Sequence, residues 1–383
     1  MARTPFRFSS PPALLAAALL AALPATAQLT SPPSGDNQFA SVTQGIGPIR
    51  LTVQYNSPDV HGPQGEDRRG KIWGTNVAHY GLANLGFGSC TECPWRGGAN
   101  ENTVFTTSHD VKVQGQPLPA GTYGLHFIAG PDEWTVIFSK NHTSWGSYFY
   151  DPKEDALRVT AKPEKSEYHE WLTYEFIDRK PDRATVALKW EDLQVPFTIS
   201  VDDIADLYID QIRRELRSSP GFNWQNWTAA AQYALQSKKN LQEALAWAER
   251  GADANRFGGQ ENFTTLTTLA ELQAANGKAD DSRKTLERAV NHATAGPVDI
   301  HRYGRQLLLQ GRKDEALRVF ELNAKRHPNV WPVHVGLARG YAAVGRTKEA
   351  LAEARLALAQ APDDTNRQAL EALIKELEAG GNR

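Results

Sequence analysis

The spacing of hydrophobic residues changes once along the chain and separates two kinds of structure. Apolar and polar residues alternate over Ile49–Asn56, the period expected of a strand with one buried face. Segments of the same character continue to residue 201, separated by turn signals such as Gly130-Pro131-Asp132. These further predicted strands are Thr103–Thr107, Val111–Val113, Gly121–Ile128, Trp134–Ser139, Ala156–Ala161, Trp171–Ile177, Arg183–Trp190 and Val195–Val201. Because no helix is predicted between them, residues 49–201 are expected to form an antiparallel β-sandwich.

A helical period replaces the alternation after residue 201. Asp202 is predicted to cap a helix, and Pro220-Gly221 is predicted to end it. The apolar residues that recur at helical spacing are Ile204, Leu207, Tyr208, Ile212 and Leu216. We expect residues 202–220 to form a connecting helix that docks the two halves of the chain.

A repeated segment occupies the remainder of the chain. The sequence of Gly311–Ala316 recurs at Gly345–Ala350, and Gly277–Ser282 precedes Gly311–Ala316 by the same interval. Lys239–Ala244 is a fourth copy that lacks the glycine and is offset by four more residues, which we place around Phe257–Gln260. Glycine permits the turn after a first helix, and alanine allows paired helices to approach closely. The spacing therefore predicts consecutive helical hairpins.

This helix–turn–helix period of about 34 residues resembles the tetratricopeptide repeat. The residues of the last copy that stand near the signature positions of that family are Trp331, Gly336, Tyr341, Gly345, Ala350 and Pro362. The resemblance covers about residues 222–362 and implies about four repeats within 221–364, with a capping helix and tail over 365–383. The predicted fold class is therefore α+β in two domains, an N-terminal antiparallel β-sandwich and a C-terminal all-α array of helical hairpins.

Residues 1–27 have the character of a signal peptide. Arg3 and Arg7 precede an Ala/Leu-rich run over Pro12–Leu23, and small residues stand at Ala25–Ala27. The run is shorter than the roughly 20 residues of a membrane-spanning helix. Cleavage is predicted after Ala27, which leaves a mature chain without a transmembrane segment, in the periplasm or secreted. Residues 28–48, rich in Ser, Pro, Gly and Gln, are predicted to be a flexible lead-in.

Charge and motif content narrow the possible functions. Lysine and arginine number 42 against 44 acidic residues, a net charge of −2, and no block of like charge occurs. Nucleic-acid binding requires a basic face, so no nucleic-acid partner is predicted. The sequence contains no Gly-x-Ser-x-Gly elbow, phosphate-binding loop, dinucleotide fingerprint or His-Glu-x-x-His helix. No cofactor and no metal are predicted.

The two cysteines, Cys90 and Cys93, lie in a Gly-rich excursion between residues 70 and 98. A short-loop disulfide suits an oxidising compartment and is the favoured interpretation. A redox-active pair would need a helix N-terminus to stabilise the thiolate, whereas glycine and proline flank this pair. A zinc site would need two further ligands, and only His79 lies close in sequence.

Four strings in the β-rich part resemble a known family. They are Trp95–Glu101, Leu118–Tyr123, Glu133–Phe138 and Tyr150–Asp155, and they occur in this order. Together they resemble the bacterial family called domain of unknown function 2911, over roughly Ser41–Asp202. The chain departs from that family in a longer loop before Trp95, where the cysteines lie. The resemblance implies a secreted β domain and no particular chemistry.

Three polar residues follow the long loop and form the first candidate ligand site. Arg96 offers a planar donor fork for a carboxylate or phosphate, Asn100 adds directional hydrogen bonds, and Glu101 could act as a base or ligand. The structural alternative, which we favour, is an Arg96–Glu101 ion pair that holds the loop, with Asn100 satisfying a turn.

Further candidates follow on a strand and in an aromatic loop. His126 lies on the face of its strand opposite Tyr123 and would become an acid, base or metal ligand if that face were wet or lined a cavity. Trp145 and Tyr148 lie in a loop dense in aromatic residues, which could hold a sugar or peptide. Packing against the sandwich is the favoured role for that loop.

Two hypotheses of function follow. The leading one is an exported, non-enzymatic interaction protein whose helical-repeat groove binds a protein or peptide. The alternative is a hydrolase-like or small-ligand site in the β domain, built around Arg96, Asn100, Glu101 and His126. Convergence of these four side chains in one pocket would favour the alternative, so whether the protein is an enzyme stays open at this point.

Overall fold

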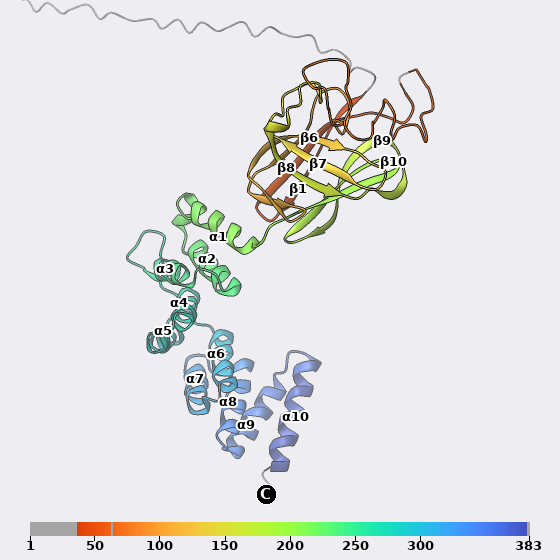
Figure 1. The fold of residues 1–383 in the computed structure, drawn as a ribbon. Coiled ribbons are helices and arrows are strands. Elements are labelled where there is room, and N and C mark those ends of the chain that lie inside the picture. The colour runs from red at the N-terminus through yellow and green to blue at the C-terminus, as the bar shows by residue number, and fades with distance from the viewer. Residues whose placement is uncertain (1–36, 63, 381–383) are drawn as a thin grey trace, which may run out of the picture.

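The structure, a computed structural model, describes residues 37–62 and 64–380 as a β-rich region followed by a helical region (Figure 1). The predicted signal peptide, residues 1–27, and the first part of the predicted lead-in lie outside the described residues. Within the described ranges, no helix is both long enough and apolar enough to cross a membrane.

The β-rich region contains two antiparallel sheets. One has six strands in the order β1-β2-β3-β6-β7-β8, and the other has four in the order β5-β4-β10-β9. The strands are β1 Gln38–Ile46, β2 Ile49–Ser57, β3 Thr103–Thr107, β4 Val111–Val113, β5 Gln116–Leu118, β6 Gly121–Ile128, β7 Trp134–Ser139, β8 Asp155–Ala161, β9 Glu164–Lys180 and β10 Arg183–Ser200. The prediction of an antiparallel β-rich N-terminal region is confirmed.

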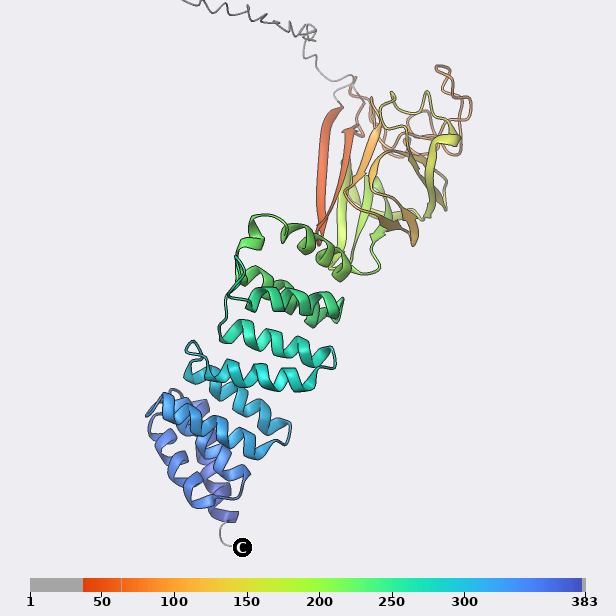
Figure 2. The ribbon, with the colours of Figure 1, turned by 90° about the vertical axis from the view of Figure 1, so that its left-hand side faces the viewer.

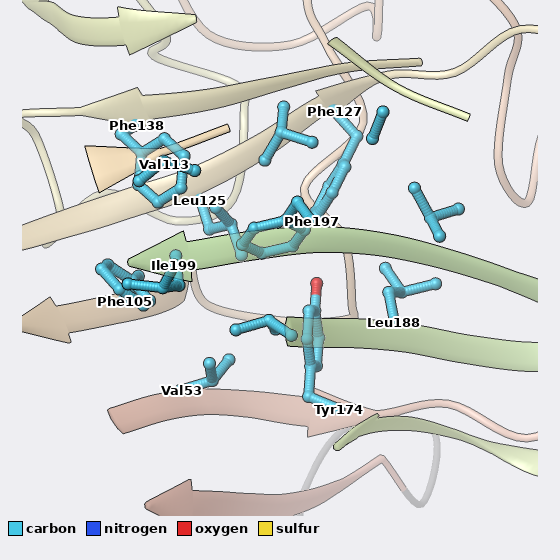
Figure 3. Close-up of a cluster of buried hydrophobic side chains, with 14 of the residues drawn as sticks. Val53, Phe105, Val113, Leu125, Phe127, Phe138, Tyr174, Leu188, Phe197 and Ile199 are labelled. Atoms are coloured by element: carbon cyan, nitrogen blue, oxygen red, sulfur yellow. The ribbon is translucent and has the colours of Figure 1, made fainter. Parts of the chain in front are cut away.

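Side chains from both sheets form one hydrophobic core (Figure 3). Val53, Phe105 and Phe138 come from the six-stranded sheet, and Leu188 and Phe197 come from the four-stranded sheet. All of these are almost completely buried. Burying one such side chain contributes roughly 1.5–3 kcal/mol, so this shared core holds the two sheets together.

Part of the predicted flexible lead-in, residues 28–48, is a strand instead. Strand β1 pairs with β2 along its whole length, from Gln38 opposite Ser57 to Ile46 opposite Ile49. Its more buried residues include Ala40 and Val42, which alternate with more exposed neighbours. The prediction was wrong here because small and polar residues fill most positions of the strand, so its period of two is weak.

Two predicted strands, Arg183–Trp190 and Val195–Val201, form the single long strand β10. The register with β9 shifts on either side of Glu191, and Glu191 itself has a positive φ of 55°. A bulge of this kind adds residues without ending the strand. The sequence prediction interpreted this local irregularity as a break between two strands.

Helix α1, Ile204–Glu215, lies between the two regions and contributes side chains to both cores. Ile204 and Leu207 pack against the β core, whereas Ile209 is buried in the core of the first helical hairpins. The cap is Asp203, whose side chain accepts a hydrogen bond from the Ala205 amide, and not the predicted Asp202.

Close packing and ion pairs fix α1 on both sides. Gly47, in the turn between β1 and β2, has a φ of +55°, and a Cβ there would lie 2.6 Å from Ile204 Cδ1. On the other side, Arg213 of α1 binds Glu243 through Nε and Nη2, both at 2.7 Å. Close packing of Ile204 against Gly47 therefore fixes the start of α1 on the β-rich region, and a bidentate ion pair fixes its end on the helical region.

The helical region is a series of antiparallel hairpins that stack one after another (Figure 2). The hairpins are α2–α3, α4–α5, α6–α7 and α8–α9, and α10 follows against α9. The helices are α2 Trp224–Ser237, α3 Leu241–Ala252, α4 Phe263–Ala275, α5 Ala279–Asn291, α6 Pro297–Leu309, α7 Lys313–Arg326, α8 Trp331–Ala343, α9 Thr347–Ala359 and α10 Asp364–Gly380. The C-terminal region is therefore all-α, as predicted.

Glycine in the left-handed conformation makes the turn inside three of the hairpins. Gly277, Gly311 and Gly345 have φ values of 76°, 75° and 81°. The first hairpin has no glycine at this place, and its turn uses Lys238 and Asn240 at φ values of 56° and 47°. The repeated glycine of the sequence therefore marks a backbone conformation that other residues adopt at a cost.

Within the first two hairpins and within the last two, the first helices lie closer together than the second helices. Helix α2 packs against α4, and α6 packs against α8. No comparable contact joins α3 to α5 or α7 to α9 among the described residues. A stack that is tighter along its first helices curves toward them, so the first helices form the inner side of the array.

Phe320 of α7 shows how closely the helices approach. Its ring is fully buried against α6 and α8. A Cβ at Gly304, Gly336 or Gly340 would lie 2.3, 2.6 or 2.9 Å from an atom of this ring. One aromatic ring thus occupies the space that three absent side chains leave, and no larger residue fits at these glycines without displacing it.

We expect Gly311→Ala to lower the free energy of unfolding of the array by about 1 kcal/mol. The added Cβ would touch nothing within 4 Å, so the effect should come from the backbone alone. Lys238→Gly should have the opposite sign and stabilise by about 0.5 kcal/mol. Urea unfolding followed by far-ultraviolet circular dichroism measures both. Equal stabilities of Gly311→Ala and the parent protein would contradict this explanation.

Candidate functional site

Arg96 is held between a strand and the aromatic loop. Its neighbour Trp95 pairs with Phe127 of β6 through two backbone hydrogen bonds of 2.8 and 2.7 Å. The guanidinium donates from Nη1 to the Asn100 carbonyl oxygen and lies 4.9 Å from the centre of the Tyr148 ring. Arg96 therefore uses an N–H donor and the flat face of its guanidinium to hold two loops of the protein itself.

The favoured Arg96–Glu101 ion pair is not formed. Glu101 is exposed, and its Oε2 accepts a hydrogen bond of 2.8 Å from Asn56 Nδ2. Arg96 instead bonds the backbone of Asn100, which has a φ of 55° and accepts a 3.5 Å hydrogen bond from Asn37 at its side chain. Arg96 holds the loop, as the structural hypothesis expected. It does so through the Asn100 carbonyl and not through Glu101, which bonds Asn56.

His126 is buried and does not face solvent. Its exposed fraction is 2%, its Nδ1 lies 2.9 Å from Ser147 Oγ, and its ring packs edge-on against Tyr150. Burial and the nearby positive charge of Arg96 lower the pKa of His126 to about 3. The imidazole is therefore neutral near pH 7, and the wet face on which its role as an acid, base or metal ligand depended is covered by the loop containing Ser147.

The aromatic loop is only partly used for packing. Tyr148 contacts Arg96 and lies 5.7 Å from Phe87, centre to centre. Trp145, by contrast, is 50% exposed, and Phe87 and Phe149 are 67% and 45% exposed. The packing role expected for the loop fits Tyr148 and does not fit Trp145.

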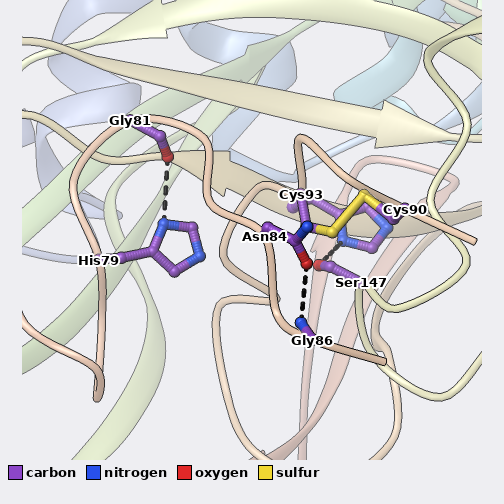
Figure 4. The surroundings of a disulfide bond; sticks show 8 residues. His79, Gly81, Asn84, Gly86, Cys90, Cys93 and Ser147 are labelled. Carbon is purple, nitrogen blue, oxygen red and sulfur yellow. Dashed lines mark hydrogen bonds between the residues drawn. A yellow bond between two sulfur atoms is a disulfide. The ribbon is translucent and has the colours of Figure 1, made fainter. Parts of the chain in front are cut away.

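The structure joins Cys90 and Cys93 by a disulfide bond (Figure 4). Both cysteines are buried, and they pack with Ile137 and Tyr150. The Cys90 amide also donates a hydrogen bond of 3.0 Å to the Tyr148 carbonyl. Over residues 37–62 and 64–380, no group of three or more His, Cys, Asp or Glu side chains could hold a metal ion. The disulfide therefore closes a short turn within the long loop, and the Cys90 hydrogen bond joins that turn to the aromatic loop.

The predicted β-domain residues thus converge only in part. Arg96, His126 and Tyr148 lie together. Glu101 instead bonds Asn56, and the Trp145 side chain is exposed. The buried imidazole and the exposed carboxylate share no hydrogen bond: Glu101 Oε2 accepts from Asn56, and His126 Nδ1 lies against Ser147. The arrangement favours a structural role for this group over acid–base chemistry.

A different site, which the sequence did not reveal, lies in the helical array. The first-helix packing is interrupted between the second and third hairpins, because α6 packs closely against neither α4 nor α5 in the described part of the chain. Cavities of about 640 and 390 Å³ open there, and Arg283, Tyr303 and Arg312 line both. We call these two neighbouring cavities, which share three lining residues, the inter-hairpin cleft. It extends from the inner side, between α4 and α6, to the outer side, between α5 and α7.

The inter-hairpin cleft has an apolar floor and a charged rim. Val290, Leu322 and Leu286 provide apolar surface, and the first two pack in the small cluster that still joins α5 to α6 and α7. Further rim residues carry both signs of charge: Asp280, Lys284, Glu287, Glu315 and Arg318. An apolar floor supplies binding energy, and alternating charges supply orientation.

The sequence contains no signal for this cleft. The repeat glycines Gly277, Gly311 and Gly345 are evenly spaced, so the repeat interval runs unchanged across the interruption. The cleft arises where packing between helices is reduced to a small cluster, and local spacing does not report such packing.

Comparison with known proteins relates the β-rich region to a family. Residues 37–199 match the sequence model of a family described as protein of unknown function (DUF2911). The resemblance predicted from the four strings between Trp95 and Asp155 is therefore confirmed, with slightly different limits. No curated protein matches the sequence.

The helical region resembles solved structures of repeat proteins. YrrB, described as a TPR protein with an unusual peptide-binding site, is 20% identical with a TM-score of 0.30, over 44% of this chain and 89% of its own. TTC0263 of Thermus thermophilus, described as a thermophilic TPR protein, is 20% identical with a TM-score of 0.31, over 45% of this chain and 91% of its own. MamA of AMB-1 is 18% identical with a TM-score of 0.31, over 42% of this chain and 83% of its own.

Replacing His126 with Gln should weaken the pH dependence of stability. In the unfolded chain His126 takes up a proton below about pH 6.5, whereas the folded protein resists protonation down to about pH 3. The stability contributed by this group is complete above pH 6.5 and is lost as the pH falls toward 3, by up to about 1.4 kcal/mol per pH unit. Urea unfolding followed by tryptophan fluorescence at several pH values measures the slope. Identical slopes for His126→Gln and the parent protein would contradict a neutral, buried imidazole.

Proposed function

We propose that this protein is a non-enzymatic interaction protein that binds a peptide segment of a partner protein in the inter-hairpin cleft. The observation that carries the proposal is the interruption of helix packing between α5 and α6, which leaves apolar residues accessible between two ordered hairpins. Ordered walls matter because a site that is already formed does not spend binding free energy on ordering itself.

The size and lining of the cleft support a peptide ligand. Its larger cavity, about 640 Å³, lies in the range of about 300–1,000 Å³ typical of pockets that bury a ligand. Both cavities are open to the surface and lie between parallel rows of helical side chains, so a chain could enter on the inner side and leave on the outer side. Apolar side chains of the peptide would contact Leu322 and Leu286, and its polar groups would face the rim.

The β-rich region would serve as the attachment point of the array. We propose that its two sheets form a sandwich and that α1, which packs in both cores, fixes the direction of the array. The signal peptide predicted over residues 1–27 supports a periplasmic or secreted site of action, where a disulfide such as Cys90–Cys93 persists. Fractionation of cells expressing the full chain, with mass spectrometry of the mature N-terminus, tests cleavage after Ala27.

We expect Arg283→Glu to weaken peptide binding at least about tenfold, equivalent to about 1.4 kcal/mol. Arg283 lines both cavities, and a reversed charge there would repel the groups that the arginine attracts. Peptides selected from a phage-displayed random library on the full-length protein, then synthesised and titrated by fluorescence anisotropy, provide the measurement.

The matched control is Arg288→Glu, on the same helix. Arg288 is similarly exposed and also belongs to a surface ion pair, with Glu261, but it does not line the cleft. The control should bind the selected peptides as the parent protein does, and circular dichroism should show both variants folded. Selection of no peptide, or equal binding by both variants, would refute the proposed function.

A further inference from the structure

An exposed cluster of aromatic rings lies where the long loop meets the aromatic loop. The Phe87 ring contacts Tyr148 and Phe149 edge-on, at 5.7 and 6.2 Å between ring centres. Phe87 is 67% exposed and Phe149 is 45% exposed, and Trp145, three residues before Tyr148, is 50% exposed. We call Phe87, Trp145, Tyr148 and Phe149 the aromatic platform. Side chains of this size are normally buried, so a cluster of them at the surface marks a place where a ligand binds.

The two loops that carry the aromatic platform are held to each other by their backbones. The Cys90 amide donates to the Tyr148 carbonyl at 3.0 Å. Gly88 has a φ of +79°, and a Cβ there would collide with the same carbonyl oxygen. Ala83 and Cys93 exchange two further hydrogen bonds of 3.0 and 2.9 Å within the long loop. The exposed rings therefore stand on a fixed backbone, and a ligand does not have to order it.

The residues that follow Trp145 hold its backbone in place. Gly146 has a φ of +58°, and a Cβ there would collide with the Arg96 guanidinium, which itself lies 4.9 Å from the centre of the Tyr148 ring. Ser147 is completely buried. The chain is thus anchored directly after Trp145, whereas half of the Trp145 side chain stays exposed.

The two loops carry almost no charge. Residues 81–93 contain one charged side chain, Glu92, and residues 141–149 contain no Lys, Arg, Asp or Glu. The neighbouring Arg96 lies against the Tyr148 ring and donates to the Asn100 carbonyl, so its guanidinium serves the protein itself. An anionic membrane surface or a charged polypeptide would require complementary charges beside the rings. These loops favour a neutral ligand instead.

Neutral hydrogen-bonding groups flank the rings along both loops. Ser89, Thr91 and Thr143 are exposed, and their hydroxyls form no hydrogen bond within the part of the chain that the structure describes. Asn84 is also exposed, and its Oδ1 accepts a hydrogen bond of 2.8 Å from the Gly86 amide, which leaves its Nδ2 to donate outward. Hydroxyl and amide groups both donate and accept hydrogen bonds without charge, as the hydroxyls of a sugar do.

The exposed ring area is small for a protein partner. Because an aromatic side chain offers about 150–250 Å², the exposed parts of Phe87, Trp145 and Phe149 together amount to on the order of 300 Å². A stable protein–protein interface buries about 800 Å² on each partner. A chain of sugar rings needs less area, because each sugar packs one apolar face of C–H groups on one aromatic ring and directs its hydroxyls sideways.

We propose that the aromatic platform binds a neutral polysaccharide, whose sugar rings pack on Phe87, Trp145 and Phe149 and whose hydroxyls bind the flanking polar groups. Tyr148 supports the other rings, since Arg96 covers one of its faces. This inference goes beyond the proposed function and does not depend on it. The platform belongs to the β-rich region and the inter-hairpin cleft to the helical array, so the polysaccharide and the peptide do not compete.

Native affinity electrophoresis of the full-length protein tests the proposal, with a neutral polysaccharide cast into each gel. Dextran, laminarin, hydroxyethyl cellulose, galactomannan and glycol chitin are the probes. We expect at least one of them to retard the parent protein, and Phe87→Ser/Trp145→Ala to weaken that binding at least about tenfold. Calorimetric titration of the retarding polysaccharide should give the same affinity at low and physiological salt, because no ion pair contributes.

The matched control removes exposed aromatic rings outside the platform. Phe257 is 77% exposed and contacts another exposed ring, Phe222, at 5.5 Å, and Trp171 of β9 is 43% exposed. The variant Phe257→Ser/Trp171→Ala should bind the polysaccharide as the parent protein does, and circular dichroism should show both double variants folded. Arg283→Glu, which tests the cleft, should also leave polysaccharide binding unchanged.

Three results would overturn the proposal: retardation by none of the five probes, equal weakening in the platform variant and its control, or retention only by dextran sulfate that physiological salt abolishes. Sedimentation velocity tests another occupant, since a parent dimer that becomes a monomer in Phe87→Ser/Trp145→Ala would assign the rings to a second copy of the chain. Polysaccharide binding without any peptide binding would refute the proposed function alone, and peptide binding without polysaccharide binding would refute this inference alone.

Discussion

The second half of the helical array depends on the close approach of α6 and α8, which glycine makes possible. Phe320 occupies the space opposite Gly304, Gly336 and Gly340, so α6, α7 and α8 form one unit. Packing of this density leaves side chains no room to reach a ligand. The same constraint explains the cleft, because the apolar residues of α5, α6 and α7 stay accessible where α4 and α6 do not make this approach.

The two regions of the protein place their exposed groups differently. In the β-rich region, the polar residues that looked most reactive are used internally: Arg96 holds two loops, and His126 is buried beneath one of them. In the array, by contrast, Arg283 lines an open cavity. The inter-hairpin cleft therefore lies on the helices, and the β-rich region supports them through α1.

Much of the architecture could be predicted from local patterns. The alternation in Ile49–Asn56 and the interval between Gly311 and Gly345 report backbone geometry, which depends on neighbouring residues. Strand β1 was missed because small and polar residues fill most of its positions. The Arg96–Glu101 pair failed because Arg96 bonds the backbone of Asn100, a left-handed residue, and Glu101 bonds Asn56 instead. The cleft could not be predicted at all, since it depends on which helices touch across more than one repeat.

Hydrogen–deuterium exchange of the full-length protein, with and without a peptide selected for binding, tests the central claim most directly. If the interruption between the second and third hairpins is the binding site, the peptide should slow exchange in α5, α6 and α7, on both walls of the cleft, and leave β6 and the aromatic loop unchanged. Protection confined to the β-rich region, with unaltered exchange in Ala279–Asn291 and Pro297–Leu309, would contradict the account.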